Sequence, residues 1–278
     1  MPDSNSIPYP SGILTGLAGD LPLEPSTTPA GPMVVFDHVS IGFNDHPVLD
    51  DVSFHVDRGR TLCILGRSGV GKSVALRILM GFLKPDSGSV YVEGQEITGL
   101  DEEGMREVRK RLTMVFQNGA LFDSMSVFEN VAFPLRERGG LEDEQVEQIV
   151  DRLIGLVGAE DVRDALPASL STGRRRAVAI ARALASQPEI VLYDEPTTMV
   201  DPLIARRLGN LIQRLKKQLG FTSIVVTHDM RFAQSLADTV LFLHQGRAAY
   251  FGPLTGFLAS QDENIKQFLN LDAYVLPM

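Results

Sequence analysis

The sequence has a single cysteine and no basic residue near its start. Cys63 lies in the apolar run TLCILG, so a disulfide framework within the chain is excluded and a buried strand position is expected. The first Lys or Arg is Arg58, and seven of the sixteen prolines fall within residues 1–32. A secretory signal needs a basic start and a continuous apolar segment, so none is expected here.

Long apolar runs and an excess of positive charge are also missing. No uncharged apolar stretch approaches the ~18–20 residues that span a bilayer. Lys and Arg number 26 against 35 Asp and Glu, which gives a net charge of −9 and excludes a general nucleic-acid-binding surface. The 44% hydrophobic content is ample for a sizeable core. We expect a cytosolic protein, or one that reaches a membrane only through partners.

Strand and helix patterns alternate along most of the chain. Short apolar runs predict strands at 33–41, 52–56, 61–65, 89–94, 111–117, 189–195, 222–228 and 239–252. Helical periodicity lies between several of them, and this alternation predicts a mostly parallel sheet.

Three segments depart from that alternation. Residues 118–187 carry only amphipathic helix patterns and predict an inserted helical subdomain within a domain at 33–252. The proline-rich segment 1–32 predicts a flexible tail, although its piece ILTGLAGDL could dock on another surface. Residues 253–278 form a C-terminal extension whose apolar end, LDAYVLPM, either packs on a partner or frays.

The run GRSGVGKS at residues 66–73 matches the phosphate-loop pattern G-x-x-x-x-G-K-[ST] between a predicted buried strand and a helix. Its glycines let successive N–H groups turn inward as an anion nest, at the positive end of the following helix. Lys72 can reach the β- and γ-phosphates, and the Ser73 hydroxyl can ligate Mg²⁺. The sequence therefore predicts a nucleoside triphosphate site formed by Gly66, Arg67, Ser68, Gly69, Val70, Gly71, Lys72, Ser73 and Val74.

A second part of this site follows the apolar run of EIVLYDEP. Asp194 and Glu195 come at the carboxyl end of a predicted buried strand, where open α/β sheets place their ligands. Asp194 suits the Mg²⁺ shell, and Glu195 is placed to orient or deprotonate the attacking water. A bare Asp-Glu pair is weak evidence alone, but its position downstream of a phosphate loop makes it strong.

Four further short motifs complete a known order. They are Gln117 in MVFQN, the run Leu170-Ser171-Thr172-Gly173-Arg174, the triplet Met199-Val200-Asp201, and His228 in VVTHD. With these motifs, residues 33–252 resemble the nucleotide-binding subunits of ATP-binding-cassette (ABC) transporters. The resemblance implies an α/β phosphate-loop (RecA-like) ATPase core, with an antiparallel β edge and an inserted α-helical subdomain. It also implies a homodimer that hydrolyses ATP with Mg²⁺, each ATP held between one phosphate loop and the opposing LSTGR signature.

The resemblance implies a role for each motif residue. Phe43 stacks on adenine, with packing in the edge sheet alone as the less favoured alternative. Gln117 senses Mg²⁺ and the water, and His228 contacts the γ-phosphate, so both join Lys72 and Glu195 in catalysis. Ser171 and Gly173 hold the γ-phosphate of the other protomer's ATP, and Asp201 reaches across the dimer. Metal contacts fall to Ser73, Gln117 and Asp194, whereas Arg174, Arg175 and Arg176 are expected mostly on the helix surface.

Two motif positions depart from the family pattern. Thr172 stands where a second glycine is usual and puts a β-branched side chain in a crowded turn, and Met199-Val200 replaces the commoner small residue and Leu. We expect both to slow closure of the dimer. A non-hydrolysing regulatory subunit is the alternative they suggest, but the intact Lys72 and Glu195 oppose it.

The transported substrate is suggested by residues 116–137, FQNGALFDSMSVFENVAFPLRE. This stretch resembles the cassettes of Mla-type phospholipid transport systems and their Mce-linked relatives. That resemblance implies an integral-membrane permease and an Mce-domain lipid-binding subunit as partners. It also implies a peripheral position at the cytoplasmic face of the inner (plasma) membrane. The alternatives are an importer ATPase for a small solute such as an amino acid, and a soluble ABC ATPase of DNA repair or translation.

Overall fold

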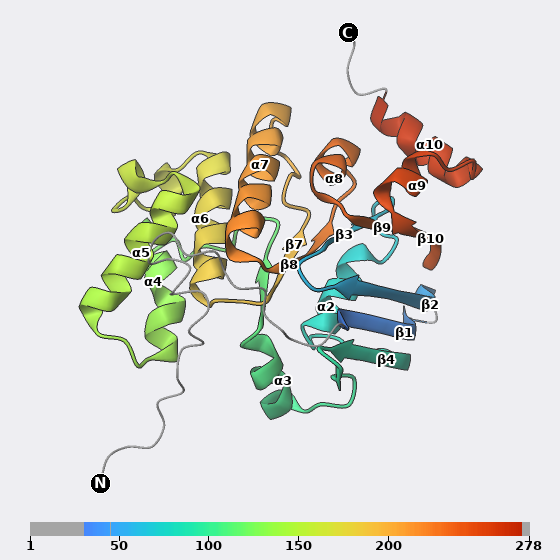
Figure 1. Ribbon diagram of the computed structural model, residues 1–278, viewed down its shortest axis with the longest axis horizontal. Helices are drawn as coiled ribbons and strands as arrows, with labels where there is room; N and C mark the ends of the chain where they lie inside the picture. Colours follow the sequence, from blue (N-terminus) through green and yellow to red (C-terminus); the bar gives the residue numbers. More distant parts are fainter. Residues whose placement is uncertain (1–30, 45, 274–278) are drawn as a thin grey trace.

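The computed structural model describes residues 31–44 and 46–273, which form two β-sheets and a set of surrounding helices (Figure 1). The predicted tail and its ILTGLAGDL piece, within residues 1–30, lie outside the described residues. The strands are β1 (Pro32–Phe43), β2 (His46–Asp57), β3 (Thr61–Leu65), β4 (Ser87–Val92), β5 (Gln95–Glu96), β6 (Leu112–Val115), β7 (Ile190–Asp194), β8 (Thr222–Val226), β9 (Thr239–His244) and β10 (Arg247–Pro253). The helices are α2 (Lys72–Leu79), α3 (Glu102–Arg109), α4 (Val127–Arg138), α5 (Asp143–Val157), α6 (Thr172–Ala185), α7 (Pro202–Leu219), α8 (Met230–Leu236), α9 (Leu254–Leu258) and α10 (Glu263–Ala273), with short 3-10 turns at Glu160–Val162 and Pro167–Ser169.

The larger sheet has the strand order β10-β9-β3-β8-β7-β6. The neighbouring strands from β9 to β6 are all paired in parallel, as the alternating pattern predicted. The interpretation of residues 239–252 as one strand is wrong, because β9 and β10 form an antiparallel hairpin. Its two central residues, Gln245 and Gly246, have φ values of 51° and 78°, the left-handed conformation that tight hairpin turns require.

The smaller sheet is antiparallel, with the order β2-β1-β4-β5. It faces one side of the parallel sheet across a core that includes α2, and Phe36 stacks on Phe54 there with ring centroids 4.4 Å apart. Side chains along β3 alternate between the two cores, with Leu62 on this side and Cys63 on the other. The α/β fold with an antiparallel part is therefore confirmed, and the antiparallel strands form a sheet of their own in addition to the edge strand β10.

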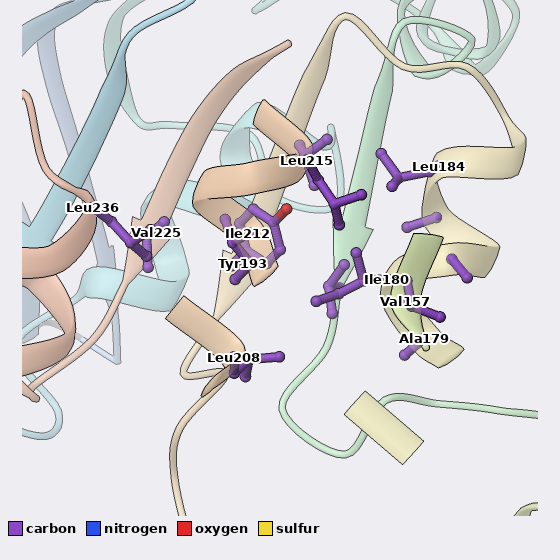
Figure 2. Close-up of a cluster of buried hydrophobic side chains, with 14 of the residues drawn as sticks. Val157, Ala179, Ile180, Leu184, Tyr193, Leu208, Ile212, Leu215, Val225 and Leu236 are labelled. Carbon is purple, nitrogen blue, oxygen red and sulfur yellow. The ribbon is translucent and has the colours of Figure 1, made fainter. Parts of the chain in front are cut away.

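Helices α4, α5 and α6 lie together at one end of the molecule (Figure 1). A reciprocal capping box between Ser126 and Glu129 starts α4, and no strand is present between residues 118 and 187. Their hydrophobic core continues without a break into the parallel sheet: Ile180 of α6, Tyr193 of β7 and Ile212 of α7 belong to the one cluster that Figure 2 shows. The division into a core and an inserted subdomain at 118–187 accordingly stays a prediction.

The described part of the C-terminal extension packs on its own chain. The rings of Phe257 in α9 and Phe268 in α10 lie 5.6 Å and 5.1 Å from that of Phe242 in β9. The segment LDAYVLPM at the end of the extension lies outside the residues whose side chains are described, so the prediction for it stays a prediction. In the described part of the chain, no helix combines the length and the apolar character needed to cross a membrane.

Candidate active site

The phosphate loop joins the buried end of β3 to the start of α2. Gly66, Gly69 and Gly71 have φ values of 150°, 81° and 105°, in the range that L-residues rarely adopt. A Cβ atom on Gly66 would lie 2.6 Å from the carbonyl oxygen of Leu243, and one on Gly71 would lie 2.7 Å from a methyl of Leu49. Glycine is therefore required at both positions by close approach as well as by conformation.

The side chain of Lys72, the first residue of α2, is held over the phosphate loop by carbonyl oxygens of that loop. Its Nζ donates to the carbonyl oxygens of Gly66 at 2.9 Å and Arg67 at 3.1 Å. The same Nζ lies 3.3 Å from Oε1 of Glu195, and the lysine side chain is only 6% exposed. The cation is thus fixed between the phosphate loop and the carboxylate that follows β7.

The Ser73 hydroxyl and the Asp194 carboxylate meet although they are far apart in sequence. Ser73 Oγ donates to Asp194 Oδ1 at 2.6 Å. Both are hard oxygen donors, which suits Mg²⁺ with further ligands from phosphate and water. Within the described residues, no group of three or more His, Cys, Asp or Glu side chains is arranged to hold a metal ion.

Gln117 lies two residues beyond β6, which ends at Val115, so the predicted strand 111–117 is too long by its last two residues. Its side chain is exposed in the loop that leads to α4. No interaction joins Gln117 to Ser73 or Asp194 among the described residues, and its assignment to the metal stays a prediction.

Glu195 begins a strained turn at the end of β7. Its φ is 48°, and its N–H donates to the carbonyl oxygen of Val226 on β8 at 2.9 Å. Oε2 lies 2.8 Å from His228 Nδ1 and accepts a 3.3 Å hydrogen bond from Thr198 Oγ1. A left-handed residue other than glycine is uncommon and marks strained sites, and here it turns the carboxylate toward both Lys72 and His228.

The charges around Glu195 determine its protonation. Burial alone would raise the pKa of Glu195, but the hydrogen bond from His228 and the charges of His228 and Lys72 outweigh it, so its pKa lies below the ordinary value. The hydrogen bond to Glu195 in turn raises the pKa of His228 above 6.5, against the opposing effect of burial. Glu195 is consequently ionised at neutral pH, as a group that accepts a proton from water must be.

This pair predicts a pH-dependent stability. Glu195 stabilises the folded state above its unfolded pKa of about 4.3, and this stabilisation is lost as pH falls through its lowered folded pKa. His228 stabilises the folded state fully below its unfolded pKa of about 6.5, and this stabilisation is lost as pH rises through its raised folded pKa. We expect the free energy of unfolding of the wild type to exceed that of His228→Gln most between about pH 4.3 and 6.5. Urea unfolding of both proteins from pH 4 to 8.5 measures this difference, and a difference independent of pH would contradict it.

Three other predicted residues are not joined to this cluster by any hydrogen bond or ion pair in the described part of the chain. Ser171 caps α6 by accepting from Arg174 N at 3.4 Å, and Asp201 caps α7 by accepting from Leu203 N at 2.8 Å. Both are exposed. Phe43 is 43% exposed at the end of β1. Capping and edge packing account for their local structure, so their roles toward ATP stay predictions.

The signature turn is open at Thr172 and tight at Gly173. Thr172 is exposed as the first residue of α6, whereas a Cβ on Gly173 would lie 2.8 Å from a methyl of Ile204. Within one protomer, the expectation of crowding at Thr172 is therefore wrong. Beside this turn, a cavity of about 560 Å³ lies among the end of α5, the start of α6 and α7, and its lining includes Gly173, Ala177, Ile204 and Leu208.

The expectation that the signature arginines lie mostly on the helix surface fits Arg174 and Arg175 but is wrong for Arg176. Arg174 pairs with Asp161 at 2.6 Å and Arg175 is exposed, but Arg176 is only 6% exposed. The helical spacing contained a signal for this, because Arg176 lies four residues before the buried Ile180 on the same face. Thr198, which contacts Glu195, had no comparable signal in the sequence.

Comparisons with known proteins agree on one family. The family model described as ABC transporter matches residues 49–198. The chain is 38% identical over 225 residues to the intermembrane phospholipid transport system ATP-binding protein MlaF of Haemophilus influenzae, which covers 81% of this chain and 85% of that relative. It is 37% identical over 245 residues to the methionine import ATP-binding protein MetN of Brucella abortus, which covers 88% of this chain but 66% of that relative.

Solved structures show the same fold. The cbiO1 protein of Clostridium perfringens, part of the ABC transporter complex cbiONQ, has a TM-score of 0.77 at 28% identity, over 86% of this chain and 95% of that one. The dimeric ATP-binding cassette MJ0796, bound to ADP and Pi, has a TM-score of 0.72 at 29% identity, over 80% of this chain and 99% of that one.

Proposed function

The chain belongs to the ABC transporter family and carries its ATPase domain, and from this premise we propose that its ATP hydrolysis drives the transport of phospholipid. In this proposal the chain is a homodimer at the cytoplasmic face of the inner (plasma) membrane. It is held there by an integral-membrane permease that works with an Mce-domain lipid-binding subunit. Dimeric cassettes among the structural relatives support the homodimer.

Each step of hydrolysis has a residue in the observed cluster. Lys72 and the N–H groups of the phosphate loop bind the phosphates, and Ser73 with Asp194 would hold Mg²⁺, which neutralises charge on them. Glu195, kept ionised by Lys72 and His228, orients the water and accepts its proton. His228 steadies the carboxylate at Oε2, and Thr198 donates a hydrogen bond to the same oxygen. Ser171 and Gly173 complete the site from the partner protomer.

The lipid assignment rests on residues 116–137. In the structure they form the loop after β6 and most of α4, with Phe116 and Phe122 exposed by 40% and 42%. The similarity to MlaF, across 85% of that protein, supports the same substrate class. Methionine import relatives of 37–40% identity favour a second candidate, an importer for a small solute such as an amino acid.

Purification from native membranes separates the two candidates. We expect the tagged full chain, extracted in mild detergent, to bring with it a multi-spanning permease, an Mce-domain protein and retained phospholipid, identified by mass spectrometry. A permease with a small-solute binding protein would replace the lipid assignment by the importer and leave the ATPase in place. Recovery without any membrane protein would overturn the transport proposal and favour a soluble ABC ATPase.

The Thr172→Gly variant tests whether the unusual signature slows turnover. We expect its maximal rate of ATP hydrolysis to rise a few-fold, because the side chain that would face the partner protomer's nucleotide is removed from an exposed position. The rate is measured at saturating ATP and compared with that of the wild type at equal protein concentration. An unchanged or lower rate would show that Thr172 does not limit closure of the dimer.

A further inference from the structure

Arg176 of α6 contacts two chain segments that lie far apart in sequence. Its Nη1 donates to the carbonyl oxygen of Phe116 at 3.4 Å, and its Nη2 donates to that of Thr198 at 3.3 Å. Phe116 directly precedes Gln117, and Thr198 lies between Glu195 and Asp201. Because α6 itself begins at the Ser171 cap, one side chain links the signature turn to both segments.

The chemistry of this contact is unusual for a buried cation. No carboxylate forms an ion pair with Arg176 within the described residues, and its hydrogen-bond partners there are the two backbone carbonyls. Burial lowers the pKa of this guanidinium, as does the neighbouring charge of Arg175. A buried charge without a counter-ion costs stability, and an apolar side chain of similar size often serves stability as well or better. The two hydrogen bonds to carbonyl oxygens offset part of that cost, so stability alone is a weak reason for an arginine at this position.

The surroundings of the first turns of α6 show what else holds them in place. The first turns of α6 border the cavity of about 560 Å³, lined there by Gly173 and Ala177. Gly173 lies close to Ile204 of α7 beside this cavity, and the hydrogen bonds of Arg176 give the same turns a second attachment, to Phe116 and Thr198. Thr198 also donates to Oε2 of Glu195 at 3.3 Å, which connects Arg176 to the carboxylate through one residue.

We propose that Arg176 is a positioning residue that fixes the signature turn of α6 relative to Gln117 and to the Glu195–Asp201 segment. This inference rests on the proposed function, since it assigns Arg176 to the hydrolysis step of the dimer. The phosphate loop of each protomer binds nucleotide without Arg176. Loss of the contact lets the signature turn and the carboxylate shift independently, and small misplacements of reacting groups lower a rate strongly.

The Arg176→Met variant tests the proposal, because Met fills the buried space, donates no hydrogen bond and leaves no charge. We expect kcat for ATP hydrolysis to fall roughly 10- to 100-fold while KM changes less than about threefold. We expect the melting temperature of the full chain to stay the same or to rise. A purely structural role would instead lower the melting temperature and leave kcat per folded molecule unchanged.

Arg182→Met is the matched control on the same helix. Arg182 also donates to backbone carbonyls, those of Ala120 at 2.7 Å and Gly119 at 3.3 Å, but among the described residues it forms no hydrogen bond with the segment after Glu195. We expect its kcat to stay within about threefold of the wild type. An equal loss in both variants would overturn the proposal, because the effect would then belong to the general attachment of α6.

The remaining outcomes separate this inference from the function on which it rests. A wild-type protein that hydrolyses ATP together with an equally active Arg176→Met variant would overturn the positioning role alone. A loss of ATP affinity in Arg176→Met as large as its loss of kcat would also overturn it, because binding at the phosphate loop should not change. A wild-type protein without ATP hydrolysis would overturn the proposed function and this inference together.

Discussion

The Glu195→Gln variant is expected to lose ATP hydrolysis by about 10²- to 10⁴-fold, the range that a general base contributes. An amide of the same size keeps the contacts of the turn but cannot accept a proton from water. The phosphate loop is untouched, so ATP binding should persist and the ATP-bound homodimer should accumulate. Turnover assays, and size-exclusion chromatography with light scattering in the presence of ATP, measure the two effects.

Glu189→Gln provides the matched control for this substitution. Glu189 lies just before the first residue of β7, at the end of the strand away from Glu195 and the phosphate loop. It pairs with Arg58 at 3.0 Å. We expect it to hydrolyse ATP at the wild-type rate. Retained turnover in Glu195→Gln would remove Glu195 from the chemistry, and a persistent monomer with ATP would count against the dimeric scheme.

The Lys72→Met variant should lose most of its affinity for ATP. Hydrogen bonds to charged groups contribute about 1.5–3 kcal/mol each, so losing the lysine's contact with the phosphates should raise the Kd for ATP roughly 10- to 100-fold. Fluorescence titration with a labelled ATP analogue, in the presence of Mg²⁺, measures the Kd. The variant also removes the Lys72 cation from beside Glu195, whose side chain is only 14% exposed. The pKa of Glu195 should therefore move upward.

Lys84→Met controls for the loss of a positive charge from the chain. Lys84 is exposed beyond the end of α2 and has no place in the phosphate loop, so its Kd should match that of the wild type. An unchanged Kd in Lys72→Met would show that the backbone nest alone holds the phosphates, and Lys72 would then have no binding role.

Much of the fold followed from local pattern. The short, mainly apolar runs at β3, β7 and β8 were identified as strands, and the phosphate loop between β3 and α2 was visible from its glycines. Residues 239–252 were misjudged, since a strand and a tight hairpin share the same apolar composition. The signal was the Gln245-Gly246 pair, which adopts the left-handed turn.

The signature arginines show why a run of charge is hard to interpret from sequence. Arg174, Arg175 and Arg176 are adjacent, but successive residues of a helix point about 100° apart, so the three cannot share one environment. Which of them is buried depends on where the loop after β6 and the segment after Glu195 pass α6. Those paths are properties of the whole chain.

The sequence by itself determined the parts of the site that are contiguous: the nest of residues 66–73 and the acidic pair at the end of β7. Each depends on backbone conformation within a few residues, which local side chains control. Only the tertiary structure decided which distant groups meet. Ser73 reaches Asp194 across 121 positions of sequence, and Lys72 and His228 converge on Glu195. These contacts arise because β3, β7 and β8 are adjacent parallel strands, and the carboxyl ends of such strands bring their loops to one edge of the sheet.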